Sequence, residues 1–235
     1  MNLDPIILAV DTATAACSVA ISHDGATHSE VQIGSNIHSA VLLEMVQNVI
    51  SEAQLSVQDI DAVAVGQGPG SFTGLRIGVG AAQGIAYGIG APMIGISSLE
   101  ALAHEAIGFG AQSIIAGIDA RMGEIYWAEY RLKDHELLNV GDITVSGPER
   151  ISVAGSSCVL VGNAWSEYWD QLPAAVLNIA HHKNEITYPN ASVLLQLARA
   201  KYDQQNLVSA MDFKPVYVRN DVAKKSSKPL PGRRV

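Results

Sequence analysis

Two aspartates end matching apolar runs, and they are the strongest sign of enzymatic chemistry in the sequence. Asp11 follows the run Ile6–Val10, and Asp119 follows the run Ile114–Ile118. Carboxylates at the ends of buried strands are suited to hold Mg²⁺ and, through it, phosphate groups. This pair therefore keeps open one interpretation of the chain, a diverged ATPase or small-molecule kinase.

The segment from Gly66 to Gly74 is a glycine-rich loop that leads into a predicted helix. Ser71 or Thr73 can cap that helix, and free amides at a helix N-terminus attract an anion. The loop lacks the Lys-Ser/Thr pair of a Walker A motif and the acidic residue that a dinucleotide fingerprint places about 20 positions on. It is either a tight structural turn or part of a weak anion site. The candidate anion-site residues are Asp11, Ser71, Thr73 and Asp119.

The other catalytic and metal-binding patterns are incomplete. His104-Glu105 begins a zinc-binding pair, but Gly108 stands where the second histidine should be. His181-His182 lies in a polar segment and is typical of a surface loop. Cys17 and Cys158 are too few for a disulfide framework and are typical of reduced thiols. The sequence thus predicts no catalytic residue, no metal site and no cofactor.

The helix predicted from about Thr73 to Tyr87 has glycines along one side. A glycine inside a helix costs about 1 kcal/mol relative to alanine, so this pattern needs a reason. A face without side chains allows another backbone to approach closely. That backbone belongs either to the protein's own sheet or to a partner, and both readings stay open.

Apolar periodicity predicts an α/β fold with an internal repeat. The first half reads as strand, strand, strand, helix, strand, helix, strand. Its strands are predicted at Ile6–Val10, Ala16–Ile21, Thr27–Ile33, Ile60–Val65 and Met93–Ile96, and its first helix at His38–Ala53. The opening recurs in the second half at Ile114–Asp119 and Glu124–Leu132, with Val159–Val161 as a further strand and Asn190–Tyr202 as a closing helix. Two such units describe the duplicated ribonuclease-H-like lobes of the actin, hexokinase and Hsp70 superfamily.

Composition and charge limit the possible functions. The chain is 48% hydrophobic and 16% charged, which is apolar enough to hint at a surface that meets a partner. No segment reaches the roughly 20 apolar residues of a membrane span. We expect a cytoplasmic protein without membrane contact. Its expected parts are a first lobe at 1–105, a second lobe at 106–220 and a basic tail at 221–235.

The net charge of −8 is unevenly distributed. From Lys214 onward lie seven of the 15 basic residues and a single acid, which leaves eight basic and 22 acidic residues, a balance of −14, before it. An acidic body repels nucleic acid over about a Debye length, so direct binding of nucleic acid by that body is not expected. The basic tail either contacts a phosphate backbone or is a solvated terminus.

Several motifs together give the chain a close resemblance to the TsaB (YeaZ) family. The resemblance spans almost the whole chain and is densest over residues 6–130. The motifs are Asp11–Thr14, His38-Ser39, Gly66–Gly78 with its Gly-Pro-Gly-Ser-Phe-Thr-Gly run, Ile118–Glu124 and Pro215–Arg219. The run from Gly68 to Gly74 also distinguishes the chain from the catalytic subunit TsaD, which shares the fold.

The comparison with TsaD implies that the chemistry of the fold has been lost. The two metal-binding histidines of the TsaD segment His-Leu-Glu-Gly-His are replaced by Ser98 and Leu102, which do not form a metal site. Asp119 is followed by the bulky pair Arg121-Met122 where ATP-binding relatives have small residues. Gly162 is a single glycine where a Gly-Gly adenosine loop is expected. The nucleotide cleft is therefore predicted to be vestigial.

The resemblance implies an interaction subunit. Members of the family pair with TsaD through two helices of the first lobe, form homodimers through much the same surface, and work with the small ATPase TsaE. The complex transfers threonylcarbamoyl to N6 of the tRNA adenosine 3′ to the anticodon, so tRNA is met indirectly. The partner interface predicted on this basis comprises Leu42, Met45, Val46, Val49, Gly74, Gly78, Ala81, Gly84, Ile85 and Gly88.

Overall fold

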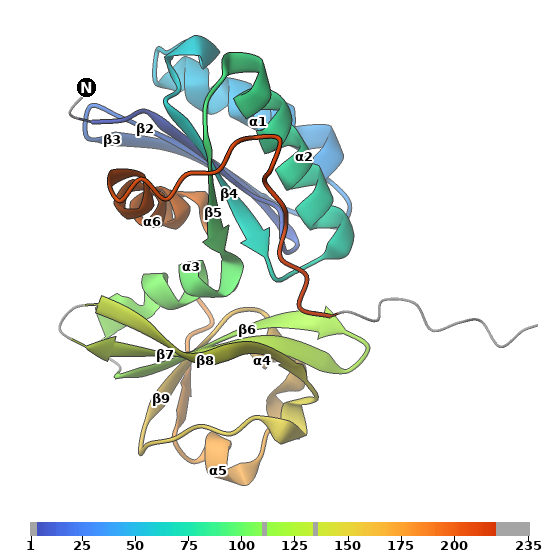
Figure 1. The fold of residues 1–235 in the computed structure, drawn as a ribbon. Helices are drawn as coiled ribbons and strands as arrows, with labels where there is room; N and C mark the ends of the chain where they lie inside the picture. Colours follow the sequence, from blue (N-terminus) through green and yellow to red (C-terminus); the bar gives the residue numbers. More distant parts are fainter. Residues whose placement is uncertain (1–3, 110–111, 134–135, 220–235) are drawn as a thin grey trace, which may run out of the picture.

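The computed structural model describes residues 4–109, 112–133 and 136–219, which form two mixed five-stranded sheets with helices between and outside them (Figure 1). The first sheet contains β1 (Ile7–Asp11), β2 (Ala16–His23), β3 (Ala26–Ile33), β4 (Ala62–Gly68) and β5 (Met93–Ser97). Its strand order is β3-β2-β1-β4-β5. The first three strands pair antiparallel, whereas β1, β4 and β5 pair parallel.

The second sheet repeats this plan. It contains β6 (Ser113–Arg121), β7 (Glu124–Lys133), β8 (Glu136–Ser146), β9 (Cys158–Val161) and β10 (Ala180–His182). Its order, β10-β9-β6-β7-β8, is the order of the first sheet read from the other edge. Strands β6, β7 and β8 pair antiparallel, and β6, β9 and β10 pair parallel. The predicted duplication of ribonuclease-H-like lobes is confirmed, with β8 as a long strand that the sequence did not reveal.

The helices follow the predicted pattern in the first half and are shorter in the second. The α-helices are α1 (His38–Glu52), α2 (Phe72–Ile89), α3 (Ser98–Glu105), α4 (Ala164–Tyr168), α5 (Ala174–Leu177) and α6 (Ala191–Asp203). Short 3₁₀ turns occur at Val57–Asp59, Ala106–Phe109, Pro148–Arg150 and Trp169–Gln171. Helix α2 begins where the Ser71 hydroxyl accepts the Gly74 amide, and it ends at Gly90 in the left-handed conformation (φ +73°).

Helices α3 and α6 lie between the two sheets, and each packs across the boundary between the expected lobes. The closing helix α6, expected in a second lobe at 106–220, packs against the first sheet, and the Ala191 amide donates to Ser18 Oγ (2.9 Å). Helix α3, expected in the first lobe at 1–105, instead buries Leu99 and Leu102 against the second sheet. Figure 1 shows both helices in one layer between the two sheets, with α1 and α2 outside the first sheet.

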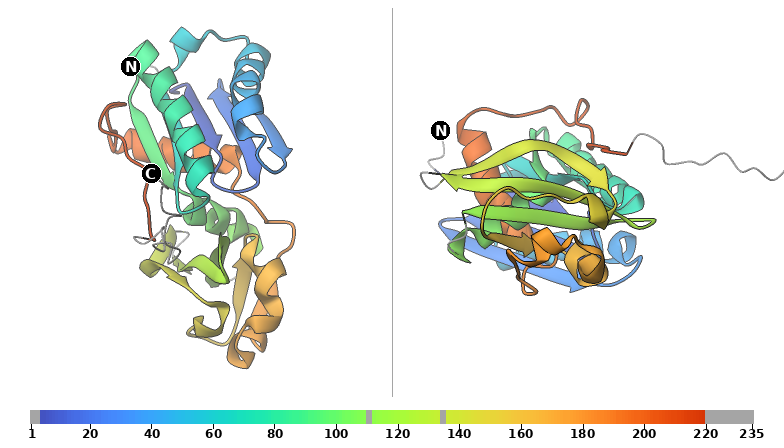
Figure 2. Two further views of the ribbon diagram at one scale, coloured as in Figure 1. Left: turned by 90° about the vertical axis from the view of Figure 1, so that its right-hand side faces the viewer. Right: turned by 90° about the horizontal axis from the view of Figure 1, so that it is seen from below.

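The chain after α6 returns along the first lobe as a C-terminal strap, residues 204–219. Val208 pairs with Met93 on the edge strand β5, and the Gln83 side chain donates to the carbonyl oxygens of Ala210 and Phe213. Further on, the Val216 amide donates to the Gln67 carbonyl (2.8 Å). Figures 1 and 2 show the strap beside α2, ending at the second lobe.

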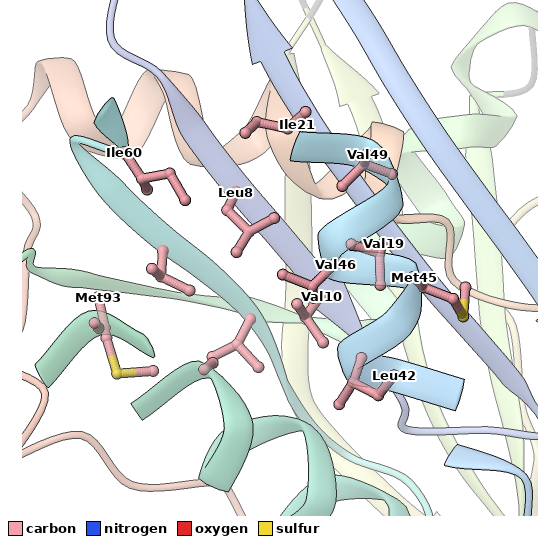
Figure 3. Close-up of a cluster of buried hydrophobic side chains, with 14 of the residues drawn as sticks. Leu8, Val10, Val19, Ile21, Leu42, Met45, Val46, Val49, Ile60 and Met93 are labelled. Atoms are coloured by element: carbon pink, nitrogen blue, oxygen red, sulfur yellow. The ribbon is translucent and has the colours of Figure 1, made fainter. Parts of the chain in front are cut away.

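Helix α1 forms the core of the first lobe with one apolar stripe. Leu42, Met45, Val46 and Val49 point toward the outer face of β1 and β2 (Figure 3). All four are at most 5% exposed. Full burial of each such side chain is worth about 1.5–3 kcal/mol, so this stripe anchors the helix on its own sheet.

The glycines of α2 are of two kinds. A Cβ at Gly74 or Gly78 would overlap the Thr12 carbonyl or hydroxyl, and the Thr12 hydroxyl donates to the Gly74 carbonyl (2.8 Å). A Cβ at Gly84 or Gly88 would meet no atom within 4 Å. The first pair is therefore required by internal packing, and the second pair is not.

Replacing one glycine of each kind by alanine should separate them. Gly84→Ala adds helix propensity without overlap and should raise the free energy of unfolding by up to about 1 kcal/mol. Gly78→Ala gains the same propensity but displaces Thr12, so the free energy of unfolding should fall by about 1–2 kcal/mol. Urea denaturation at low protein concentration measures both; equal stabilities would contradict this packing.

Candidate functional site

A cavity of about 410 Å³ lies between the two lobes, a volume typical of small-molecule sites. Its walls are the loop after β1, the start of α2, the end of β6 and the C-terminal strap. Of the four candidate anion-site residues, Ser71, Thr73 and Asp119 line this cleft. The structure thus brings together residues that are far apart in the sequence.

Asp11 is the exception, because it is fully buried and does not line the cleft. Its Oδ1 accepts the Ala13 amide (2.9 Å), and its Oδ2 accepts the Ser98 hydroxyl (3.4 Å). Gly66 leaves room for the carboxyl group, since a Cβ there would overlap it. Burial raises the pKa of Asp11 to about 7, although the two hydrogen bonds lower it. Its predicted role at an anion or Mg²⁺ site has no support from the lining of the cleft, and in the structure Asp11 is an internal anchor.

Asp119 lies at the cleft but is engaged by its own lobe. Its Oδ1 accepts the Arg121 amide (2.8 Å) and the Tyr168 hydroxyl (3.0 Å), and its Oδ2 faces the Arg121 guanidinium (3.1 Å). Its own amide donates to the Asn163 side chain (3.1 Å). The carboxylate therefore organises the end of β6 and is balanced by a cation that the protein itself supplies.

The start of α2 offers donors at the cleft. The Ser71 hydroxyl is occupied by the Gly74 amide (3.2 Å), while Thr73 is exposed. Within the part of the chain that the structure describes, no hydrogen bond is found for the amides of Phe72 and Thr73. Such free amides suit an anion, but this helix end alone does not define a site.

The positions at which the sequence comparison expected metal and adenosine sites to be lost are occupied by internal packing. Ser98 and Leu102 are fully buried at α3. Gly162 lies against the Gly117 carbonyl, and the Trp165 indole below it donates to the Val161 carbonyl (2.7 Å). Among residues 4–109, 112–133 and 136–219, no group of three or more His, Cys, Asp or Glu side chains could hold a metal ion.

His38 is a cleft residue whose role the sequence did not reveal. It is 6% exposed at the start of α1, and its Nε2 lies 2.8 Å from the Thr14 carbonyl oxygen. Its Nδ1 is buried without a hydrogen-bond partner among the described residues. The sequence offered one indication of this role, since His38 is the first residue of a predicted helix. The contact fixes the loop after β1 against α1.

The mouth of the cleft carries an aromatic cluster that sequence reasoning also missed. The rings of Phe72 and Tyr217 lie 5.6 Å apart, and the Arg76 guanidinium stacks 3.7 Å from the centre of the Phe72 ring. Arg76 also donates to the Tyr217 hydroxyl (3.2 Å). The signal was available in two separate motifs, Gly66–Gly78 and Pro215–Arg219, but their contact is tertiary.

A second candidate site is an apolar groove of about 450 Å³ on the outer face of α1 and α2, called the α1–α2 groove below. It is lined by Leu43, Val46, Gln47, Ile50, Ser51, Leu55, Val57 and Ile85. Leu43 is 59% exposed, although it belongs to the middle of a helix. No Asp, Glu, Lys or Arg is among the lining residues.

The predicted partner interface stays a prediction, and the structure shows that half of its ten positions are occupied by internal packing. Leu42, Met45 and Val49 belong to the internal core, and Gly74 and Gly78 are covered by Thr12. Of the remaining positions, Val46 and Ile85 line the groove, Ala81 is half-buried, and Gly84 and Gly88 are exposed. The resemblance indicated the two helices but not which side of each is free. On α1 the exposed side carries Leu43, which was not among the predicted positions.

The two sheets with the same strand order, facing each other across a cleft, define a protein with duplicated ribonuclease-H-like lobes. Residues 32–225 match the family model described as TsaD, tRNA N6-adenosine threonylcarbamoyltransferase. The chain is 40% identical to the tRNA threonylcarbamoyladenosine biosynthesis protein TsaB of Escherichia coli K12, over 97% of this chain and 99% of that protein. The TsaB protein of Haemophilus influenzae is 34% identical over 97% and 98%.

A solved structure agrees with these relatives. YeaZ from Pseudomonas aeruginosa superposes with a TM-score of 0.84 at 36% identity, and the match covers 91% of this chain and all of that one. The chain belongs to the TsaB family, as the resemblance of its motifs predicted. No helix of the described residues is long and apolar enough to cross a membrane.

The buried carboxyl group of Asp11 predicts a pH dependence of stability. In the unfolded chain Asp11 loses its proton near about pH 4, whereas in the folded protein its pKa is about 7. Between these values the folded state binds the extra proton, so the free energy of unfolding should fall as pH rises. The full contribution is about 4 kcal/mol, because the two pKa values differ by roughly 3 and each unit is worth about 1.4 kcal/mol.

Asp11→Asn should remove this dependence and stabilise the protein at pH 8, since the amide can keep both hydrogen bonds. Urea denaturation at pH 5 and pH 8 measures it. Asp24→Asn, a change at a side chain that is 85% exposed, serves as the control. A steep loss of stability that persists in Asp11→Asn would show that another group is responsible.

Proposed function

We propose that this protein is a non-catalytic subunit of tRNA threonylcarbamoyladenosine biosynthesis, which binds TsaD and supports it. In this role TsaD transfers threonylcarbamoyl to N6 of the adenosine 3′ to the anticodon, TsaE joins the larger complex, and the work takes place in the cytoplasm. The family membership supports the pathway. The observation that carries the subunit role is the exposed outer surface of the two helices, which combines exposed glycines of α2 with the α1–α2 groove.

Gly84 and Gly88 are the first argument for a partner. Each weakens the isolated helix by about 1 kcal/mol, and neither is needed by any contact within the folded chain. A helix face that lacks side chains lets a second backbone approach closely. A partner helix that crosses α2 at this face can approach closely because side chains are absent there. The monomer alone gains nothing from their absence.

The α1–α2 groove is the second argument. It joins the exposed Leu43 to the half-buried Ile50 and Ile85 without any charged lining residue. Removal of such a surface from water is favourable, and contiguous exposed apolar surface marks interaction sites. A second copy of this chain would cover the same surface in a homodimer, so self-association and TsaD binding should compete.

The state of the cleft supports a role outside catalysis. A diverged ATPase or kinase would use the carboxylates at the ends of β1 and β6. Asp11 is buried away from the cleft, and Asp119 is balanced by Arg121 and bonded to Tyr168. Calorimetry with MgATP tests this alternative, and tight binding or turnover by the isolated chain would restore it.

Leu43→Glu should disrupt the complex by placing a charge in the groove. We expect affinity for purified TsaD, measured by calorimetry, to fall at least about tenfold, because desolvating the carboxylate opposes binding. Leu138→Glu is the matched control, since Leu138 is 44% exposed on β8, in the other lobe. Both variants should keep the parent melting temperature.

Three outcomes decide the matter. Loss of binding in Leu43→Glu alone supports the groove as the interface. Equal binding of both variants would remove TsaD from this groove. The subunit role itself fails if the parent chain shows no association with TsaD and no homodimer at micromolar concentration.

A further inference from the structure

The mouth of the cleft carries a group of exposed side chains that the proposed interface does not use. We call this group the cleft rim; it comprises Phe72, Arg76, Arg121, Met122 and Tyr217. Phe72 and Tyr217 are 41% and 42% exposed, Met122 is 74% exposed, and the Arg121 side chain is 86% exposed. Large apolar and aromatic side chains at a cleft mouth mark a contact surface.

The rim is assembled from three separate segments and held by specific contacts. The Arg76 guanidinium stacks on Phe72 and bonds to Tyr217, which joins α2 to the C-terminal strap. Arg219 forms an ion pair with Glu124 and approaches the Met122 sulfur (3.7 Å), which joins the strap to the β6–β7 turn. The ring faces and the turn are thereby fixed in place before any ligand arrives.

The β6–β7 turn presents two side chains at some cost. Arg121 and Met122 have positive φ values of 61° and 60°, a conformation that favours glycine or asparagine. Their neighbour Gly123 shares it (φ +78°). Both side chains remain largely exposed, although Arg121 faces Asp119 and the Met122 sulfur lies near Arg219. Such strain is common where side chains are presented to a ligand.

Charge distinguishes the rim from the rest of the protein. The chain before Lys214 has a balance of −14, but the charged residues that line the cleft are Asp119, Arg121 and Arg219, a balance of +1. Arg76 adds a further cation beside them. The sequence that continues beyond Arg219 contains five basic residues and one acid. Glu124 offsets Arg219, with which it forms an ion pair, so the exposed Arg76 and Arg121 supply the positive charge at the rim. A phosphate group is attracted to these two cations more than to the acidic body of the protein.

We propose that the cleft rim binds an unpaired segment of RNA, with bases stacked on Phe72 and Tyr217 and a phosphate paired with Arg121. This proposal rests on the proposed function, whose substrate carries its modified adenosine beside the anticodon, in a single-stranded loop. Proteins bind such loops by stacking unpaired bases on aromatic rings and arginine planes. The combination of flat rings and cations favours RNA over an acidic peptide, which would use the cations alone.

Helix α2 relates this site to the partner surface. The cleft rim includes Phe72 in the first turn of α2, and the α1–α2 groove includes Ile85 near the other end of the same helix. Thirteen residues of helix separate them by about 20 Å. A partner bound in the groove would thus leave the rim open while holding its own RNA-binding surface nearby.

The test measures binding of a fluorescent anticodon stem-loop RNA by the full chain, alone and mixed with TsaD, using anisotropy. Phe72→Ala should weaken RNA binding about tenfold. Arg121→Gln should lower the slope of log K against log salt by about 0.7, the loss of one phosphate contact to a single strand. Phe109→Ala is the matched control: Phe109 is 43% exposed and lies under a cation, Lys183 Nζ, at 4.3 Å from its ring centre.

The outcomes separate this proposal from the proposed function. Reduced RNA affinity in the rim variants, with TsaD association and the Phe109→Ala variant unchanged, supports the rim. Equal RNA affinity of rim and control variants overturns it, whatever happens to TsaD binding. Loss of TsaD association in Phe72→Ala without a change in RNA affinity would make the rim a protein contact. Displacement of the RNA by polyglutamate as readily as by polyuridine would also overturn it, because stacking would then contribute nothing.

Discussion

The close contact between Thr12 and the first half of α2 positions both surfaces of this protein. The Thr12 hydroxyl donates to the Gly74 carbonyl, and Gly78 leaves the space that the Thr12 side chain fills. The Ser71 amide donates to the Ala13 carbonyl (2.7 Å), which places the helix N-terminus at the cleft. With this half fixed to the loop after β1, the other half of α2 must present Gly84 to the outside. This one packing contact therefore places the cleft rim at the N-terminal end of α2 and the surface proposed to bind a partner along its C-terminal half.

The packing of α3 and α6 between the two sheets explains why the cleft is a stable platform. Helix α6 follows the second sheet in the chain and packs against the first, whereas α3 packs against both sheets, with Ala101 toward the first and Leu99 and Leu102 toward the second. The lobes therefore share their central helical layer. The C-terminal strap adds a third link, from Gln67 on β4 to Glu124 on β7. Separation of the lobes would expose the apolar surface of this layer. Because the two lobes are held in a fixed relative position, the side chains that line the cleft are also held in place.

Local patterns predicted the strands and helices of the first lobe, because Ile6–Val10 and the stripe of α1 follow simple periodicities. The repeat at Ile114–Asp119 was enough to predict the duplicated fold. The sequence could not show that α6 crosses to the first sheet, since an amphipathic helix does not specify which sheet it covers. The resemblance marked Leu42 and Met45 as interface residues, although an apolar stripe first satisfies its own core. The contact of Phe72 with Tyr217 joins residues 145 positions apart and has no local signal.

The two aspartates near the ends of the matching strands β1 and β6 both have structural roles in this chain. Asp11 ties the end of β1 to the first residue of α3, and Asp119 holds the Arg121 backbone and side chain at the rim. Nucleotide binding at this end of β6 would require Asp119 to release Arg121, which would then leave the turn without its anchor. The contacts that Asp119 makes with Arg121 and Tyr168 therefore fix the end of β6 beside the cleft, and this structural role does not require a bound phosphate.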